Sequence, residues 1–352
     1  MKHLKKRLIL AIESSCDETA ASVAVEDKKG VKMLSNIVSS SLEIQAKYGG
    51  VVPEQAAREQ LKAIVPVIQE AMSAAQITKN DIDAVAVTEG PGLIGSLLIG
   101  VEFAKTLSLI WNKPLVAVHH LVGHFYANWI LPEVPNPKFQ IPKFPAIGLL
   151  VSGGHSDLVL MRGHGEYEYL GGTRDDAAGE CFDKAARLMN LPYPGGPMIS
   201  KLAASGNPKA YHLPRPMIGA KNFDFSFSGL KTAILNLVEA DKGILEDEQK
   251  KADLAASVEA AIVDVLVKKT VAAAQKYEVG QIVVAGGVAA NTTLRQTLQS
   301  EINKNLPQAE LHIPPIKLCT DNAAYIAAAA IYNYHPVNPL TLQANPNLSL
   351  SH

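Results

Sequence analysis

The feature that most constrains the fold is a strand, turn and strand pattern that occurs twice. Each copy has an apolar strand-like run, a turn of small or polar residues, and a second strand-like run; the copies span residues 8–25 and 146–160. The turns lie about 137 residues apart, counted from Ser15 to Ser152. That spacing is too long for a solenoid, whose period is about 20 to 50 residues, and it predicts two related lobes.

A third apolar run, residues 281–285, leads into Gly286 and Gly287, and a helix is expected from about Asn291. Glycines here let the backbone approach a ligand, although a tight connection between strand and helix is an equally simple interpretation. Helices are predicted between the strands at residues 54–74, 95–111, 177–189, 249–276 and 321–332. Alternating strands and helices indicate α/β layers.

Composition places the chain among ordinary globular proteins. Its 352 residues are 47% apolar and 19% charged, which is enough for two lobes with separate cores. The formal net charge of -1 predicts no general affinity for nucleic acid, so a polyanion site would have to be local. A basic cluster near the start is interpreted as a solvated end; it consists of Lys2, Lys5, Lys6 and Arg7.

No segment has the pattern of a signal peptide or a membrane span. The apolar run of residues 8–12 ends at Glu13 and is too short for a signal core. The best candidate span, residues 94–111, carries Glu102 and Lys105. Three widely separated cysteines argue against a disulfide framework and fit a reducing compartment. We therefore expect a cytoplasmic protein without a membrane segment.

Proline marks a lobe boundary. Residues 131–145 hold five prolines and are predicted to form an extended linker or surface excursion, so we expect the boundary there. The end of the chain from Pro336 onward is rich in Pro and Asn and is expected to trail from the fold.

His120 and His124 are the first candidate ligands. They follow an apolar run and stand four residues apart, about one helical turn, so both imidazoles would project from one face. Neutral imidazole binds Zn, Fe, Cu and Ni alike. The alternative is a helix with two ordinary hydrogen-bonded histidines. A zinc peptidase of the HExxH type is disfavoured, because Leu121 stands where its general base would be.

Asp321 is the candidate third ligand. It precedes a helix of small residues, 323–330, where an aspartate could equally serve as an N-cap. Two histidines and one carboxylate suit Fe(II) or Zn(II) and leave positions open for substrate oxygens.

Other patterns leave two interpretations open. The glycine turns at residues 152–154 and 195–197 are either simple turns or cradles for phosphate or carboxylate oxygens. Asp176, Glu180 and Asp183 fall on one helical face, which is either solvated or a site for ribose or metal. Residues 223–231 alternate aromatic and polar side chains, the pattern of a half-buried strand.

Taken together, ten motifs resemble the universal tRNA threonylcarbamoyladenosine transferase family in its bacterial form. They occur in order between about Leu8 and Tyr332, and they are residues 13–19, 49–54, 88–93, 119–124, 151–155, 175–184, 193–197, 225–231, 285–291 and 319–322.

The resemblance implies a two-lobed α/β fold, actin-like and sugar-kinase-like (ASKHA), with duplicated ribonuclease-H-like lobes and a cleft between them. The first lobe would span residues 1–130 with 320–352, and the second residues 131–319. The implied enzyme is a metal-dependent acyltransferase. It moves the threonylcarbamoyl group from threonylcarbamoyl-AMP to N6 of adenosine 37, beside the anticodon, in tRNAs reading codons that begin with A, and so forms N6-threonylcarbamoyladenosine.

The resemblance also assigns site residues. The metal ligands would be His120, His124 and Asp321, holding one divalent ion per subunit, with Fe2+ as first choice and Zn2+ as the alternative. The substrate set, for threonylcarbamoyl-AMP or ATP/ADP, would be Leu150, Val151, Ser152, Gly153, Gly154, Asp183, Gly196 and Asn291. Asp17, Glu18 and the leaving phosphate are candidates to take the amine proton.

Two departures from the family pattern stand out. Gln60 occupies a position that is often histidine in relatives, and Leu150 cannot act as the tyrosine ligand of archaeal and eukaryotic relatives. The implied partners are substrate tRNA, a shorter paralogue of the same fold as heterodimer, a small P-loop ATPase, and the synthase of threonylcarbamoyl-AMP. The competing functions are a sugar or acetate kinase of the same fold and a non-catalytic assembly subunit.

Overall fold

The computed structural model describes residues 6–137 and 139–351, the side chain of Lys47 excepted. Lys2 and Lys5 of the expected basic cluster lie outside these residues. The chain divides into two compact units. Unit 1 combines Met1–Pro142 with Thr320–His352, and unit 2 is Lys143–Cys319. The proline-rich segment, residues 131–145, therefore includes the point between Pro142 and Lys143 where the chain passes from unit 1 to unit 2.

Unit 1 is built on a six-stranded mixed sheet with the strand order β11-β5-β4-β1-β2-β3. The first three strands form an antiparallel meander, and β4 and β5 extend it in parallel. The strands are β1 (Leu8–Glu13), β2 (Glu18–Asp27), β3 (Gly30–Ser40), β4 (Ala84–Gly90), β5 (Leu115–His119) and β11 (Pro336–Val337).

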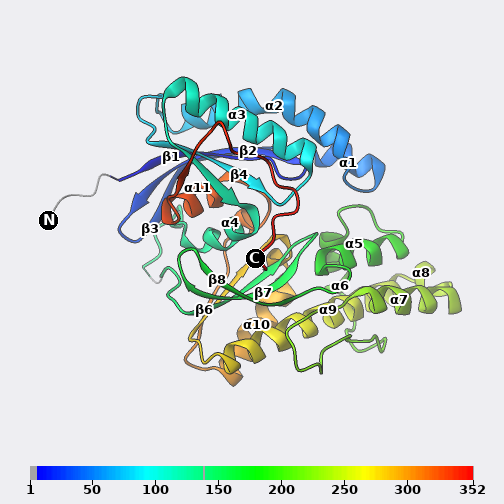
Figure 1. Ribbon diagram of the computed structural model, residues 1–352. Coiled ribbons are helices and arrows are strands. Elements are labelled where there is room, and N and C mark those ends of the chain that lie inside the picture. The colour runs from blue at the N-terminus through cyan, green and yellow to red at the C-terminus, as the bar shows by residue number, and fades with distance from the viewer. Residues whose placement is uncertain (1–5, 138, 352) are drawn as a thin grey trace. The chain divides into compact units, whose positions relative to one another are not determined.

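Helices cover both faces of this sheet (Figure 1). Long helices α2 (Pro53–Ala74) and α3 (Ile94–Trp111) lie on one face and share a core with Leu10 and Ile12 of β1. On the other face lies α11 (Ala323–Tyr332), which is buried from Ala323 to Ile331 and contacts β1, β2 and α4. The remaining helices of the unit are α1 (Leu42–Tyr48), α4 (His120–Tyr126) and the 3-10 turn η1 (Ala127–Trp129).

Unit 2 repeats the plan. Its five-stranded sheet has the order β10-β9-β6-β7-β8, from β6 (Ala146–Val151), β7 (Ser156–Gly163), β8 (Glu166–Gly172), β9 (Gln281–Ala285) and β10 (Glu310–His312). Its helices are α5 (Ala178–Leu188), α6 (Gly195–Ala203), α7 (Ser228–Ala240), α8 (Gly243–Glu246), α9 (Glu248–Lys276) and α10 (Thr292–Asn305), with η2 (Gly287–Ala290) and η3 (Ile316–Leu318).

The two sheets confirm the internal repeat predicted from the sequence. In each unit an antiparallel meander of three strands is followed by two parallel strands beside the first one. The hairpins β1–β2 and β6–β7 are the two copies of the repeated pattern. The two units are therefore built on one topology, and the turn of small or polar residues connects the two strands of each hairpin.

The alternating segment at residues 223–231 is not a strand, contrary to prediction. Phe225 makes only an isolated bridge to Thr173, and α7 begins at Ser228. The Asp175 carboxylate explains the change, because it accepts the N–H groups of Phe227 and Ser228 at 2.8 and 3.1 Å. The Asp175 side chain thus accepts hydrogen bonds from N–H groups that would otherwise need the carbonyl groups of a neighbouring strand.

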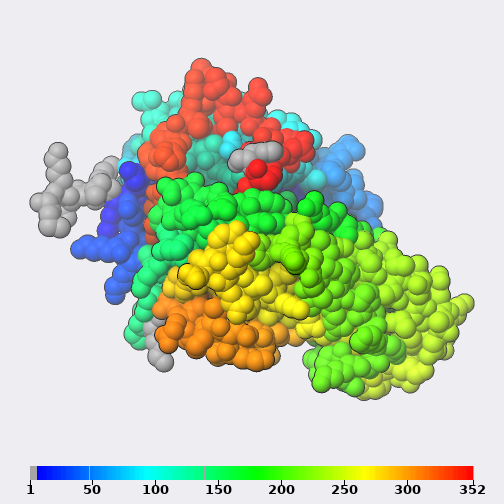
Figure 2. All heavy atoms as spheres, turned by 60° about the horizontal axis from the view of Figure 1, so that its bottom comes forward, coloured from blue at the N-terminus to red at the C-terminus, as the bar shows by residue number. Residues whose placement is uncertain are grey.

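The end of the chain packs back onto unit 1 instead of trailing, so that prediction was wrong. Strand β11 pairs with β5, and Leu342 joins the core. The Asn345 N–H donates to the carbonyl of Glu89 at 2.7 Å, and the Gly92 N–H donates to the carbonyl of Pro346 at 3.3 Å. Figure 2 shows these last residues in red over the cyan residues of the same unit.

One helix of the described residues, α3, is long and apolar enough to span a membrane by length and composition. A row of small and apolar residues along it is buried, including Leu97, Val101 and Ala104, and it packs on β4. One third of this apolar stretch is buried inside the unit. All three cysteines are free, as the sequence predicts.

Candidate metal centre and substrate loops

The two histidines project from one short helix, as their spacing predicts. Strand β5 ends at His119, whose Nδ1 accepts the N–H of Leu121 at 3.2 Å and so caps α4. The turn that follows places the rings of His120 and His124 with centroids 4.6 Å apart. Both side chains are almost fully buried, at 8% and 2% exposure.

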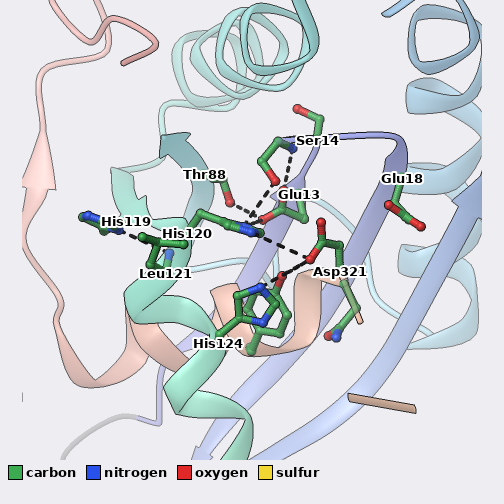
Figure 3. A network of polar contacts seen from close by, with 12 residues as sticks. Glu13, Ser14, Glu18, Thr88, His119, His120, Leu121, His124 and Asp321 are labelled. Atoms are coloured by element: carbon green, nitrogen blue, oxygen red, sulfur yellow. Dashed lines mark hydrogen bonds and ion pairs between the residues drawn. The ribbon is translucent and has the colours of Figure 1, made fainter. Parts of the chain in front are cut away.

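Asp321 completes the cluster from the other end of the chain (Figure 3). Its Oδ1 lies 3.3 Å from Nε2 of His124 and 3.7 Å from Nε2 of His120. The three ligand atoms all lie within 4.8 Å of one another. The N-cap alternative for Asp321 was wrong, because Asn322 caps α11 by accepting the N–H of Ala324. Asp321 is therefore left to face the imidazoles.

The donor set fits a divalent transition metal. Both ring nitrogens of His124 are buried without a hydrogen-bond partner among the described residues, and Nε2 approaches Asp321 only at ion-pair distance. Leaving a buried polar group unsatisfied costs about 1–3 kcal/mol, so such atoms usually have a partner that the fold is built to hold. Two imidazoles and a carboxylate are the ligands that iron and zinc accept.

The local charges favour a cation. Burial alone would raise the pKa of Asp321, but the charge of His120 and the contacts with His124 and Tyr325 outweigh it and hold that pKa below its usual value. Burial lowers the pKa of His124, so its ring stays neutral, the form that binds metals. Burial would also lower the pKa of His120, but Glu13 and Asp321 raise it to about 9. Burial would raise the pKa of Glu13, but His120 lowers it, so two ionised carboxylates surround the imidazoles. Their charge is balanced by the proton on His120 or by a bound cation that replaces it.

Glu13 is a member of the centre that the sequence did not assign. It ends β1 and is fully buried. Its Oε2 lies 3.1 Å from Nδ1 of His120 and accepts the hydroxyl of Thr88 at 2.6 Å. Its Oε1 accepts the N–H of Ser15 at 2.6 Å. The sequence did contain a signal for this role. Glu13 is an acidic residue at the end of a buried apolar run, and a buried acidic side chain needs a partner inside the protein.

Of the candidate proton acceptors, Asp17 lies at the end of the turn that follows Glu13, and Glu18 begins β2. Figure 3 places Glu18 on the far side of Asp321 from His120. Burial, then the neighbouring charges of Asp321 and Asp17, raise the pKa of Glu18 to about 10. Gln60 of α2 holds this turn, because its Nε2 donates to the carbonyl of Glu18 at 2.8 Å.

The first part of the expected substrate set lies in unit 2, at the β6–β7 turn. Leu150 and Val151 are fully buried in β6. The turn closes by a hydrogen bond from the Ser152 N–H to the carbonyl of His155 at 2.8 Å, and it leaves Gly153 and Gly154 exposed. A Cβ on Gly179 would lie 2.6 Å from the carbonyl oxygen of Ser152, so α5 begins directly against this turn.

The other members of the set are tied to helix starts. Asp183 accepts the N–H of Gly195 at 2.7 Å and also a backbone N–H of Gly196 at the start of α6. Asn291 caps α10 and donates from Nδ2 to Ser200 at 2.8 Å and to Glu259 at 2.7 Å. The side chain of Asn291 is thus engaged within the protein. Glu259, the centre of this network, was missed because it lies in a long apolar helix.

Comparisons with known proteins agree on one family. Residues 32–328 match the TsaD family, described as tRNA N6-adenosine threonylcarbamoyltransferase. The chain belongs to this family. A protein of that name from Listeria monocytogenes serovar 1/2a is 50% identical over 350 residues, 98% of this chain and 97% of its own. Another from Symbiobacterium thermophilum is 51% identical over 352 residues, with 99% of each chain covered.

Solved structures confirm the fold. HypF from T. kodakarensis superposes with a TM-score of 0.58 at 14% identity, covering 93% of this chain and 47% of that chain. A full-length HypF in a phosphate- and nucleotide-bound form gives a TM-score of 0.56 at 13% identity, covering 93% and 46%. These likenesses show the architecture only. It is the two-lobed, actin-like and sugar-kinase-like fold that the sequence of this threonylcarbamoyltransferase family member predicts.

Proposed function

We propose that the chain transfers the threonylcarbamoyl group from threonylcarbamoyl-AMP to N6 of adenosine 37 in tRNAs reading codons that begin with A, forming N6-threonylcarbamoyladenosine. Membership of the threonylcarbamoyltransferase family carries this proposal, since relatives of that name match at about half identity over nearly their whole length. The competing sugar or acetate kinase would rest on the shared fold alone, and a fold does not by itself imply a function.

A divalent metal would be held by His120, His124 and Asp321, whose ligand atoms already converge. Fe2+ is the first choice and Zn2+ the alternative, because imidazole and carboxylate suit both. When bound, such an ion supplies Lewis-acid and template chemistry for substrate oxygens. The convergence of these three side chains argues against a purely scaffolding subunit, which would not need them.

The proton of the attacking amine needs an acceptor. The exocyclic amine of adenosine is a weak nucleophile, and a positioned base speeds its attack by removing the proton as the new bond forms. Asp17 and Glu18 are the candidates on the turn beside the metal cluster. Burial and the charge of Asp321 raise the pKa of Glu18 to about 10, so this carboxyl is protonated at neutral pH, and Asp17 or the leaving phosphate is the favoured acceptor.

Unit 2 would bind the nucleotide part of threonylcarbamoyl-AMP, or ATP/ADP. The exposed Gly153 and Gly154, with open space where a Cβ would lie, can offer backbone N–H groups to phosphate or carbonyl oxygens. Leu150, Val151 and Ser152 complete that turn. Asp183 and Asn291 would set the positions of Gly196 and the α10 start for the nucleoside part.

The partners we propose follow from the family. They are substrate tRNA, a shorter paralogue of the same fold as heterodimer, a small P-loop ATPase and a synthase that supplies threonylcarbamoyl-AMP. All act in the cytoplasm, where tRNA is modified.

The deciding experiment reconstitutes the full chain with these partners, threonine, bicarbonate, ATP and unmodified tRNA, and digests the tRNA for nucleoside mass spectrometry. We expect N6-threonylcarbamoyladenosine with the wild-type chain and a loss of at least tenfold in initial rate with His120→Ala. Unmodified adenosine throughout would reject the transferase function. Full activity of His120→Ala would reject the metal-centred part alone and leave the transferase function standing.

A further inference from the structure

Glu13 is a buried carboxylate that accepts a hydrogen bond on each of its two oxygens. It has no exposed surface, and no lysine or arginine pairs with it among the described residues. The backbone N–H of Ser15 can only donate, and it occupies Oε1 at 2.6 Å. The hydroxyl of Thr88 donates to Oε2 at 2.6 Å. Both oxygens therefore act as acceptors, which is the role of an ionised carboxylate.

This arrangement decides which nitrogen of His120 carries a proton. Oε2 of Glu13 and the hydroxyl oxygen of Ser15 lie 3.1 and 3.2 Å from Nδ1. The hydroxyl can donate or accept, but an ionised carboxylate can only accept, so Glu13 requires a proton on Nδ1. The other ring nitrogen, Nε2, points toward Asp321, 3.7 Å away. That distance is too long for a direct hydrogen bond and leaves room for a cation between the two atoms. Metal-binding histidines commonly hold their second N–H against a carboxylate in this way.

We infer that Glu13 is a positioning residue that keeps the Nδ1 proton on His120 and so presents the Nε2 lone pair to the metal. The inference rests on the metal centre proposed above and adds a residue to it. Because Thr88 and Ser15 anchor both oxygens of Glu13, the carboxylate also fixes the plane of the ring. Glu13 touches neither the metal nor the substrate, and it acts only through His120.

The variant Glu13→Gln reverses the hydrogen bond with almost no change in shape. The side-chain oxygen would keep the N–H of Ser15, so the NH2 group would take the place of Oε2. It would then donate to Nδ1 of His120 instead of accepting from it, which shifts the proton toward Nε2 and weakens metal binding by that nitrogen. The Ser15 hydroxyl, 3.2 Å from Nδ1, is a neutral and therefore weaker acceptor than the carboxylate. The hydroxyl of Thr88 can turn to accept the second amide hydrogen.

Glu259→Gln is the matched control. Glu259 is also a buried carboxylate, exposed by 5%, and accepts hydroxyl and amide donors from Ser200, Asn291 and Thr293. It lies in unit 2, among residues that hold no part of the metal cluster. Its substitution makes the same change from carboxyl to amide and tests whether any buried Glu→Gln change disturbs metal binding.

The experiment titrates the metal-free full chain with Zn2+ by calorimetry and records NMR spectra with 15N-labelled histidine. For the wild type and Glu259→Gln we expect one zinc per chain, with His120 bound through Nε2 and protonated on Nδ1. For Glu13→Gln we expect an affinity about 10- to 100-fold lower. Thermal unfolding of each variant checks that it is folded.

The outcomes separate the two proposals. A wild-type chain that binds no zinc would reject the metal centre. Zinc binding by Glu13→Gln with wild-type affinity would reject the role of Glu13 while leaving the centre intact. If Glu13→Gln does not fold, the wild-type spectrum alone decides, because zinc-bound His120 without a proton on Nδ1 would overturn the inference.

Discussion

At the scale of single residues, Asp321 and Asn322 stand side by side with different tasks. Asp321 faces His120 and His124, whereas Asn322 caps α11 through its side-chain oxygen. Asp321→Ala should remove metal from the purified chain and leave the start of α11 capped. Asn322→Ala should keep the metal and lower the free energy of unfolding by about 1 kcal/mol. Elemental analysis and chemical denaturation measure the two effects; equal metal content in both variants would contradict this division.

Gln60 supports the turn between β1 and β2 through its side-chain nitrogen. Its Nε2 donates to the carbonyls of Ser14, Cys16 and Glu18 at 3.4, 3.1 and 2.8 Å, and so holds the turn that carries the candidate proton acceptors. Its Oε1 is buried without a partner among the described residues. Gln60→Leu should therefore lower kcat of threonylcarbamoyl transfer about tenfold at unchanged metal content, since misplacing a catalytic group is costly.

Two further variants complete that test: a matched control, and the histidine that relatives often carry at this position. Ser22→Ala removes a buried hydroxyl that donates to the carbonyl of Ser35 at 2.6 Å, elsewhere in unit 1, and should lower stability without a tenfold loss in kcat. Gln60→His keeps one N–H donor and loses no bond at Oε1, so its kcat should fall less than that of Gln60→Leu. Equal kcat in Gln60→Leu and wild type would show that the turn needs no such support.

The residues found from the sequence differ in kind from those missed. His120 and His124 are readable because four-residue spacing has a fixed meaning on a helix. Glu13, Gln60 and Glu259 act through neighbours 32 or more residues away in the chain, and no local pattern records those contacts. The choice between ligand and N-cap for Asp321 likewise depended on the adjacent Asn322, because either side chain can cap a helix.

At the scale of elements, β7 carries a buried carboxylate that links stability to pH. Asp157 is exposed by only 8%; burial raises its pKa to about 6 from 3.8, against the lowering effect of the Tyr169 hydroxyl. The folded state therefore binds this proton more tightly than the unfolded state does. Its contribution to stability is full below about pH 4 and is lost as the pH rises through 6.

Asp157→Asn should remove this dependence. At pH 7.5 the variant should be more stable than the wild type, by at most about 3 kcal/mol, and at pH 4 the difference should shrink or change sign. Tyr169 can still donate to the amide oxygen, which keeps its 3.2 Å hydrogen bond to this side chain. Urea unfolding of both proteins across this pH range provides the measurement. A pH-independent difference would mean that Asp157 does not titrate there.

Element predictions succeeded where burial alone sets the pattern and failed where one side chain intervenes. The repeated hairpins and the helices of residues 54–74 and 249–276 follow from apolar periodicity, and the structure places α2 and α9 there. Residues 223–231 alternate like a strand, but Asp175 satisfies their backbone N–H groups and α7 begins instead. Tertiary hydrogen bonding overrode a local pattern.

At the scale of the whole molecule, the two units are assembled from the chain in different ways. Unit 2 is one continuous segment, Lys143–Cys319, with its own sheet and its own core. Unit 1 needs both ends of the chain, because α11 forms one buried layer of its sheet and the terminal residues cover the β4–α3 turn. The metal cluster also combines these two segments, because His120 lies in the first and Asp321 in the second.

This difference predicts how fragments behave. The fragment of residues 143–319 should fold alone and unfold in one cooperative thermal transition, since it buries a complete core. The fragment of residues 1–142 should not, because without α11 the sheet residues Ile9 and Ala11 of β1, fully buried in the whole chain, would lose a covering layer. Adding residues 320–352 through a short flexible linker should restore folding and zinc binding together. Circular dichroism and calorimetry follow both properties, and a folded 1–142 fragment that binds zinc as tightly as the whole chain would contradict the roles of α11 and Asp321.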